Sequence, residues 1–329
     1  MDSRTSRRAC IAAGLAAAGG YVMPGVARAQ AYPARPVRLA VGFAPGTGPD
    51  IVTRTVGNKL GETLGQSVVV ENRAGAGGQI AAQHVAKSPA DGYTLLIADV
   101  AAISIAPAAF SKLGYDPARE LVAISELVRT DFILVVPNAS AERTVGEFVA
   151  AAKGAKNRIN FGTFGAGTPG HFGAEMLAEQ AGFKVEPVHF RATGDAVAAL
   201  VAGDVQAALL STALATAQIK GGKMRALATT APHRSPLLTD VPTFAESGFP
   251  KADFSAWFCL FAPAGTPDAV LTTLNAQAVA AVQSPEVRRR LEEAGFSVLG
   301  TGIDEAKRMV AAEAGRWKAV VQATGFKGD

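Results

Sequence analysis

Continuous apolar runs alternate with amphipathic segments through the first 230 residues, and this order constrains the fold more than any other feature. The apolar runs predict strands at 37–43, 67–72, 93–98, 132–137, 158–161, 185–190, 206–211 and 224–229. Most of them lack a strict polar–apolar alternation, which indicates strands covered on both faces. Amphipathic segments between them predict helices at 50–64, 79–87, 144–153, 171–181 and 195–202. Strand and helix alternation predicts an α/β fold with largely parallel sheets.

The last third of the chain has a different pattern. One long apolar run, at 254–262, is followed by three predicted helices at 267–284, 285–294 and 304–324. Pro267, Pro285 and Asp304 mark their starts. No Ser/Gly tract separates two domains, so a two-domain chain would cross between them within ordered segments. The runs at 132–137 and 224–229 are the predicted crossings.

The first 29 residues have the features of an export signal. Three arginines within the first eight residues precede IAAGLAAAGGYVM, a stretch too short and glycine-rich for a transmembrane helix. Ala27-Arg28-Ala29 fits a small-x-small cleavage site. Ser6-Arg7-Arg8 also fits a twin-arginine signal, so both Sec and twin-arginine export are compatible. An ordinary amphipathic helix is the alternative. We expect a mature protein that begins near Gln30 and lies in the periplasm.

Charge and cysteine content narrow the class of protein. Cleavage after residue 29 removes four arginines and one aspartate, and the formal net charge falls from +4 to +1. No Lys/Arg stripe remains, so nucleic acid is not an expected partner. Cys259 is the single cysteine of the mature chain, which excludes an internal disulfide and a cysteine-rich metal site. It lies in the apolar run AWFCLFAPA and is expected to be buried.

Four strand–helix junctions carry glycine, threonine or aspartate where a helix is predicted to begin. They lie at 45–50, 74–78, 165–170 and 192–195. Pro49 and Pro169 suit the first helical position, where no N–H is needed. Such turns offer backbone N–H groups and the helix dipole to an anion. A plain helix cap is the alternative for any single turn, and the turn at 73–78 is interpreted as structural. Several turns at the carboxyl ends of strands would converge on a cleft.

One of these turns also matches a dinucleotide-binding pattern. Gly165, Gly167 and Gly170 have the spacing G-x-G-x-x-G, and Glu186 lies 16 residues past Gly170, where a ribose-binding acid could sit. Thr168 and Pro169 replace the usual helix-opening residues. An exported protein would also not normally meet NAD. A nucleotide-dependent exported enzyme is therefore a rival hypothesis of lower weight.

Catalytic patterns are absent from the sequence. The histidines, at positions 84, 171, 189 and 233, do not have zinc-helix spacing, and there is no G-x-S-x-G or S-x-x-K. His171 and Glu175 lie one helical turn apart, which is weak evidence for a metal. Asp195 is more simply a helix cap than half of a carboxylate pair with Asp204. The residues themselves therefore give no sign of catalysis, of a metal site or of a cofactor site.

The mature chain resembles the Bug family, the periplasmic solute-binding receptors of tripartite tricarboxylate transporters. Seven segments carry the resemblance in order: YPARPVRLAVGFAPGTGPDIVTR, VVVENRAGAGGQIAAQHVAKSPADGYTLL, LGYDP, FGTFGAGTPGHFGAEML, GGKMRALATT, DVPTFAESGFP and FAPAGTPDAV. The resemblance implies a two-domain, periplasmic-binding-protein-like (type II) α/β fold that closes on a ligand. We expect a signal peptide at 1–29, a first domain at 30–133 plus 229–329, and a second domain at 134–228.

The resemblance also implies a function and partners, and it implies a binding protein that is not an enzyme and needs no metal or cofactor. A small organic carboxylate would bind in the interdomain cleft and be delivered to transmembrane transporter subunits. The same fold in a ligand sensor, with a sensor kinase as partner, is an alternative, and a monomer is expected. Dicarboxylates, citrate-like acids, amino acids and aromatic acids are all compatible cargoes.

Residues that match the family's ligand turns are expected to form the binding site. Thr47 departs from a common three-glycine turn, and the order Gly203-Asp204-Val205-Gln206 departs from Gly-Gln-Val-Asp. Arg191 is expected to meet either a second ligand carboxylate or a surface acid. The full expected set is Phe43, Ala44, Gly46, Thr47, Gly48, Asp50, Ala101, Ser104, Thr163, Gly165, Ala166, Gly167, Thr168, His171, Arg191, Thr193, Asp195 and Asp204.

Overall fold

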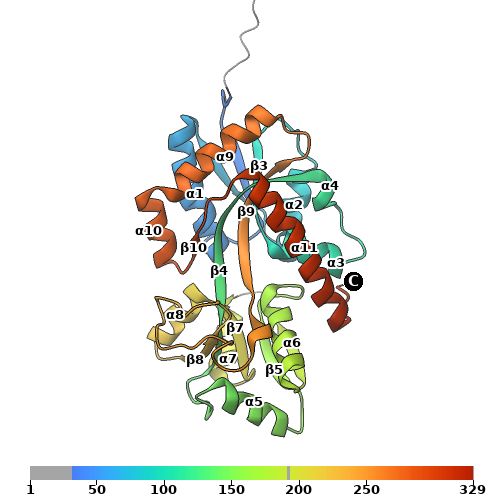
Figure 1. Cartoon of the computed structure of the whole chain (residues 1–329), viewed down its shortest axis with the longest axis vertical. Coiled ribbons are helices and arrows are strands. Elements are labelled where there is room, and N and C mark those ends of the chain that lie inside the picture. The colour runs from blue at the N-terminus through green and yellow to red at the C-terminus, as the bar shows by residue number, and fades with distance from the viewer. Residues whose placement is uncertain (1–31, 191–192, 329) are drawn as a thin grey trace, which may run out of the picture.

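The computed structural model describes residues 32–190 and 193–328, which form two lobes joined through one long strand, β4 (Leu121–Pro137) (Figure 1). The strands follow the order β2-β1-β3-β9-β4-β7-β5-β6, and β8 and β10 also pair with β4. The first half of β4 pairs antiparallel with β9, and its second half pairs antiparallel with β7 and β8. One strand therefore belongs to both lobes.

The first lobe holds the two ends of the described chain. Its strands are β1 (Val37–Val41), β2 (Val68–Asn72), β3 (Thr94–Asp99), β9 (Ser255–Pro263) and β10 (Ser297–Val298). Its helices are α1 (Gly48–Leu64), α2 (Gln79–Ala86), α3 (Ala106–Ala109), α4 (Pro117–Glu120), α9 (Asp268–Gln283), α10 (Pro285–Glu293) and α11 (Ile303–Thr324). A 3-10 turn, η1 (Ala76–Gly78), and a π-helical turn, η2 (Ala101–Ile105), complete it. β1 pairs in parallel with β2 and β3, so their carboxyl ends share one edge.

The second lobe repeats this plan on a smaller scale. Its strands are the end of β4, β5 (Ile159–Thr163), β6 (Val185–His189), β7 (Ala207–Ser211) and β8 (Met224–Thr229). Its helices are α5 (Val145–Gly154), α6 (Pro169–Ala181), α7 (Thr193–Ala202), α8 (Thr212–Lys220) and the short η3 (Pro250–Ala252). β5 pairs in parallel with β6 and β7, so the turns after β5 and β6 also share one edge.

Buried aromatic side chains join the two lobes beside the crossing strands. Phe254 stacks on Phe132 of β4 at 5.2 Å between ring centroids and meets Trp317 of α11 edge-on at 6.2 Å. Trp317 also lies 6.2 Å from Phe172 of α6. Phe172, Phe254 and Trp317 belong to one cluster of buried residues that extends into both lobes. Apolar packing of this kind holds the two lobes together where the chain crosses between them. The turns before α1 and α6 follow the carboxyl ends of β1 and β5.

Each strand and helix predicted in the first 230 residues is present, but the sheet is mixed rather than largely parallel. β9 runs antiparallel between β3 and β4, and β4 is antiparallel to all its described partners. The sequence pattern missed the first half of β4 and all of α8. The segments 132–137 and 224–229 pair with each other within the second lobe. The domain limits drawn from them stay a prediction.

Candidate functional site

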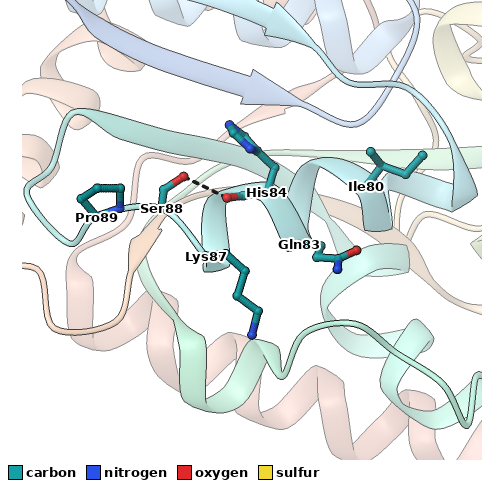
Figure 2. A pocket seen from close by; sticks show the side chains of 6 residues that line it. All are labelled: Ile80, Gln83, His84, Lys87, Ser88 and Pro89. Atoms are coloured by element: carbon teal, nitrogen blue, oxygen red, sulfur yellow. Dashed lines mark hydrogen bonds between the residues drawn. The ribbon is translucent and has the colours of Figure 1, made fainter.

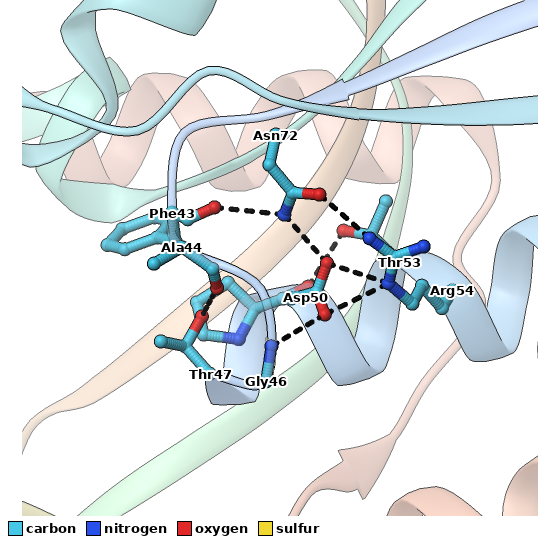
Figure 3. A network of polar contacts seen from close by, with 9 residues as sticks. Phe43, Ala44, Gly46, Thr47, Asp50, Thr53, Arg54 and Asn72 are labelled. Atoms are coloured by element: carbon cyan, nitrogen blue, oxygen red, sulfur yellow. Dashed lines mark hydrogen bonds and ion pairs between the residues drawn. The ribbon is translucent and has the colours of Figure 1, made fainter.

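The turn after β1 is held by the buried carboxylate of Asp50. Its oxygens accept hydrogen bonds from the Gly46 N–H (2.8 Å), the Asn72 side-chain amide (2.7 Å) and the Arg54 guanidinium (3.0 Å) (Figure 3). The Asn72 amide also donates to the Phe43 carbonyl at 3.0 Å. Burial opposes ionisation of Asp50, but these donors outweigh it and hold its pKa below the ordinary value. Asp50 thus shapes the turn from inside.

Helix α1 begins directly after this turn and receives no side-chain cap. Thr47 occupies the N-cap position, yet its hydroxyl donates backward to the Ala44 carbonyl at 2.7 Å. Pro49 follows in the first turn of the helix, and Gly46 has a φ of +80° that favours glycine. Ala44 and Gly46 are exposed. The turn before α1 is therefore exposed, no side-chain oxygen caps the helix, and Asp50 is the acidic residue of its first turn.

The turn after β5 in the second lobe has the same construction. Thr168 is the N-cap of α6, and its hydroxyl donates backward to the Gly165 carbonyl at 2.9 Å instead of capping the helix. Pro169 again opens the helix. Gly165 and Gly167 have φ values of +117° and +74°. Each lobe thus carries a threonine-proline turn before a helix without a side-chain cap.

Two histidines stand at the carboxyl ends of β5 and β6 beside the second turn. The ring centroids of His171 and His189 are 4.8 Å apart. The buried His171 accepts the Gly167 N–H on Nδ1 at 3.2 Å, and His189 Nδ1 lies 2.6 Å from the Thr163 hydroxyl. Burial and the neighbouring His189 lower the pKa of His171 to about 4, and burial also lowers the pKa of His189. Both rings are therefore neutral near pH 7.

A third segment follows β3. Ala101 and Ser104 lie in the π-helical turn η2, and both are buried. Among the described residues, the Ser104 hydroxyl finds no hydrogen-bond partner. Asp99, at the end of β3, accepts a long hydrogen bond of 3.4 Å from the Ala102 N–H. Burial raises the pKa of Asp99 to about 7, against the lowering effect of backbone N–H groups.

Residues near the C-terminus reach from the first lobe to the second-lobe turn. The ring of Phe326 packs on His171 and Phe172, at centroid distances of 4.8 and 5.6 Å. Gly328 donates its N–H to the Ala109 carbonyl of α3 at 2.8 Å. A Cβ placed on Gly167 would lie 3.4 Å from the ring of Phe110, directly after α3. These contacts bring the two lobes together at the turn after β5.

The structure gathers some of the predicted site residues and separates others. The first-lobe turn gathers Phe43 to Asp50, and the second gathers Thr163, Gly165, Ala166, Gly167, Thr168 and His171. Thr193 begins α7, and Asp195 lies exposed in its first turn. Asp204 lies exposed beyond the other end of α7, where its carbonyl meets the Asn160 side chain at the start of β5. Arg191 lies outside the described residues.

Glu186 does not occupy the position that a dinucleotide site requires. It lies near the amino end of β6, and its carboxylate pairs with Arg158 at 3.0 Å. The glycine turn lies beyond the carboxyl end of β5, at the opposite edge of these parallel strands. A ribose-binding acid follows its strand, so this placement disfavours the dinucleotide hypothesis.

A shallow hollow on α2 is a separate feature of the surface. It encloses about 480 Å³ and is lined by Ile80, Gln83, His84, Lys87, Ser88 and Pro89 (Figure 2). The Ser88 hydroxyl donates to the His84 carbonyl at 2.8 Å, and the Lys87 ammonium contacts Glu120. The Ser88 hydroxyl and the Lys87 ammonium are therefore already engaged. It contains no residue of the predicted site, and we place the candidate site at the strand ends instead.

Three residues near the site carried no recognised signal in the sequence. His189 is an exposed histidine at the end of β6. The only signal that could have identified it is its position opposite Thr163 in the register of β5 and β6. Phe110 and Phe326 reach the second-lobe turn by long-range packing, which no local pattern records.

Cys259 is buried as expected, and burial raises the pKa of its thiol. Within residues 32–190 and 193–328, no helix combines the length and apolarity of a membrane span.

Two lobes that share a strand, each with a glycine-rich turn before a helix, are the arrangement of a periplasmic solute-binding protein. A model described as the tripartite tricarboxylate transporter family receptor matches residues 52–326. Protein BugT of Bordetella pertussis (strain Tohama I) is 32% identical over 300 residues, covering 91% of this chain and 92% of BugT. The chain belongs to this receptor family, and the predicted recognition is confirmed.

Solved structures agree with this assignment. R. palustris Rpa4515 with adipate has a TM-score of 0.84 and 30% identity, covering 90% of this chain and 99% of that protein. MatC (Rpa3494) from Rhodopseudomonas palustris with bound malate has a TM-score of 0.79 and 32% identity, covering 88% of this chain and 100% of MatC. The predicted two-domain periplasmic-binding-protein-like fold is confirmed.

Proposed function

We propose that this receptor captures a small dicarboxylate between its lobes, with one carboxylate at each threonine-proline turn. The observation that carries the proposal is the repeated construction at Thr47 and Thr168, whose hydroxyls both turn away from the helix they precede. The relatives solved with adipate and with malate support a ligand that has two carboxylates.

Backbone groups supply most of the binding energy in this proposal. Each helix N-terminus stabilises a carboxylate by about 0.3–1 kcal/mol, and by up to about 2 kcal/mol where the site is partly buried. Charge-assisted hydrogen bonds from N–H groups add to this. Bridging waters let the same turns accept acids of different length at little cost in affinity. Asp50 acts as a positioning residue here, because its oxygens are already occupied by protein donors.

The remaining predictions extend the proposal to the whole chain. Residues 1–29 direct export and are removed, and the mature protein acts as a monomer without enzyme activity. Closure of the lobes on the ligand creates the shape that transmembrane transporter subunits recognise. We also propose that residues 230–252 move with the second lobe, because the Lys251 N–H bonds the Gln180 side chain of α6 at 3.1 Å. A sensor kinase as recipient is the alternative.

A thermal-shift panel on the mature chain tests the proposal. Succinate, malate, adipate and benzoate are compared with NAD and ATP. A ligand at a hundred times its Kd stabilises the protein by about 2.7 kcal/mol, which is a shift of several degrees. We expect shifts with dicarboxylates and none with nucleotides.

A matched pair of variants locates the binding. Ala166→Glu places a negative charge on the exposed second-lobe turn, and Ala217→Glu places the same charge on the exposed face of α8. We expect Ala166→Glu to abolish the dicarboxylate shift and Ala217→Glu to keep it. A shift with NAD alone, or equal shifts in both variants, would contradict the proposal.

A further inference from the structure

The two imidazoles at the second-lobe turn have different surroundings, although their centroids are only 4.8 Å apart. His171 is 3% exposed, while His189 is exposed at the end of β6. A carboxylate bound at this turn would lie beside a pair of groups that can each gain a proton. The hydrogen bonds of each ring decide which of them can do so.

The surroundings of His171 strongly disfavour the imidazolium form near pH 7. Its Nδ1 accepts the Gly167 N–H at 3.2 Å, so this nitrogen carries no proton and the other one does. If Nδ1 were protonated, its N–H would face the Gly167 N–H, and two donors cannot form a hydrogen bond with each other. The rings of Phe172 and Phe326 pack on both sides and offer no acceptor. His171 is therefore held as a neutral donor through Nε2–H.

The surroundings of His189 accommodate the imidazolium form. The Thr163 hydroxyl lies 2.6 Å from Nδ1 and also lies 3.5 Å from the Val188 carbonyl. When the hydroxyl donates to that carbonyl, its oxygen accepts an N–H from the ring. Nδ1 can thus be protonated without loss of a hydrogen bond, and exposure leaves Nε2 open to a ligand or water.

Few charged groups compete for His189 among the described residues. On α6 the titratable neighbours are His171 and Glu175, and Glu175 interacts with the ion pair of Arg158 and Glu186 at the far ends of β5 and β6. Asp195 lies exposed on α7, and Lys327 follows Phe326 in the C-terminal segment. No carboxylate is paired with either imidazole in the described structure, so an anionic ligand would be the first strong negative charge at His189.

We propose that His189 takes up one proton when a dicarboxylate binds and contributes its imidazolium to the second-lobe carboxylate site, while His171 stays neutral. This inference rests on the proposed function and assigns a specificity-determining residue to it. The imidazolium of His189 then neutralises one of the two negative charges of the bound dicarboxylate. A neutral isostere, such as a diamide, gains nothing from the ring.

The pH dependence follows from linkage. Burial lowers the pKa of His189 in the free protein, so the ring is neutral near pH 7. A bound carboxylate raises that pKa, because opposite charges favour the protonated form. Between the two pKa values, the affinity rises as the pH falls, by at most about tenfold per pH unit for one proton.

Calorimetric titration with malate measures the proton directly. Binding enthalpies in HEPES and in Tris at the same pH differ by the number of protons taken up times the difference in buffer ionisation enthalpy. Both carboxyl groups of malate are ionised near neutral pH, so the ligand itself supplies no proton. We expect uptake of about half to one proton near pH 7 and tighter binding at about pH 6.5 than at 8.

Three variants separate the two rings. His189→Asn keeps an atom at the Nδ1 position for Thr163 but cannot titrate, and we expect no proton uptake and a pH-independent Kd. His171→Asn keeps an acceptor for the Gly167 N–H, and we expect weaker binding with proton uptake retained. His84→Asn on α2, far from the turn, is the matched control and keeps both affinity and uptake.

The outcomes are distinguishable from failure of the proposed function. Binding of malate without proton uptake in the unaltered chain overturns this inference and leaves the proposed function standing. Retention of uptake in His189→Asn also overturns it. No binding of any dicarboxylate at any pH overturns both. Proton uptake is measured on the unaltered chain, so the inference can be refuted even if a variant fails to fold.

Discussion

Replacement of Asp50 by alanine should destabilise the first lobe and weaken ligand binding together. The change removes the buried acceptor of the exposed Gly46 N–H and of the half-buried Asn72 amide. A hydrogen bond to a charged group contributes about 1.5–3 kcal/mol. Arg54 is 47% exposed in its side chain, so its ion pair adds under about 1 kcal/mol. We therefore expect a loss of about 3–5 kcal/mol in the free energy of unfolding.

Urea denaturation of the mature chain measures this loss. Asp50→Asn retains one acceptor oxygen and should fall between the alanine variant and the unaltered chain. Glu62→Gln removes an exposed partner of Lys59 on the same helix and should leave stability unchanged within error. The pKa of Asp50 is lowered by folding, so its contribution is present above the ordinary pKa and is lost as the pH falls through the folded value.

Two results would refute the reasoning on Asp50. A loss below about 1 kcal/mol for Asp50→Ala would show that the carboxylate does not hold the turn. If Asp50→Ala lost about the expected 3–5 kcal/mol but bound malate with unchanged affinity, the turn would not form part of the binding site.

Three further changes probe the rest of the structure. Gly173→Ala places a Cβ 2.3 Å from the Phe254 ring and should cost at least about 2 kcal/mol by urea denaturation; a neutral result would contradict the packing of the lobes. Folding raises the pKa of Asp99 to about 7, so ionisation of this buried carboxyl lowers the free energy of unfolding progressively as the pH rises from about 4 to 7. Asp99→Asn should stabilise on the order of 3 kcal/mol at pH 8 and little at pH 4; equal effects at both would exclude the buried acid. Phe326→Ala should raise the pKa of His171 from about 4 toward 6.5, as read from its NMR titration; an unmoved titration would show that the ring does not bury His171.

Local patterns predicted most strands and helices because the apolar runs mark buried strands directly. β4 shows where this approach fails. Its first half contains Ser125, Glu126 and Arg129, which interrupt the apolar run. Thr301 satisfies two of these polar groups: Ser125 donates to its carbonyl at 2.8 Å, and the Glu126 N–H donates to its hydroxyl at 2.9 Å, whereas the Glu126 side chain pairs locally with Arg129. Thr301 lies far away in sequence, so no local window contains the compensation.

The two glycine-rich turns before α1 and α6 could be predicted because the residues that form them are local. Glycines at positive φ, a threonine and a proline within six residues identify a helix start without knowledge of the remaining fold. The role of Asp50 as an internal acceptor could not be read in this way, because its partner Asn72 comes from the neighbouring strand. His189 and Phe326 likewise acquire their neighbours only when β6 and the C-terminal segment meet the second turn.

A crystal structure of the mature chain with malate tests the central claim most directly. The account predicts one carboxylate within hydrogen-bond distance of backbone N–H groups in the turn at 44–48 and the other beside the turn at 165–168 and His189. Malate bound in the hollow on α2, or bound by one lobe alone with the other turn facing solvent, would contradict it.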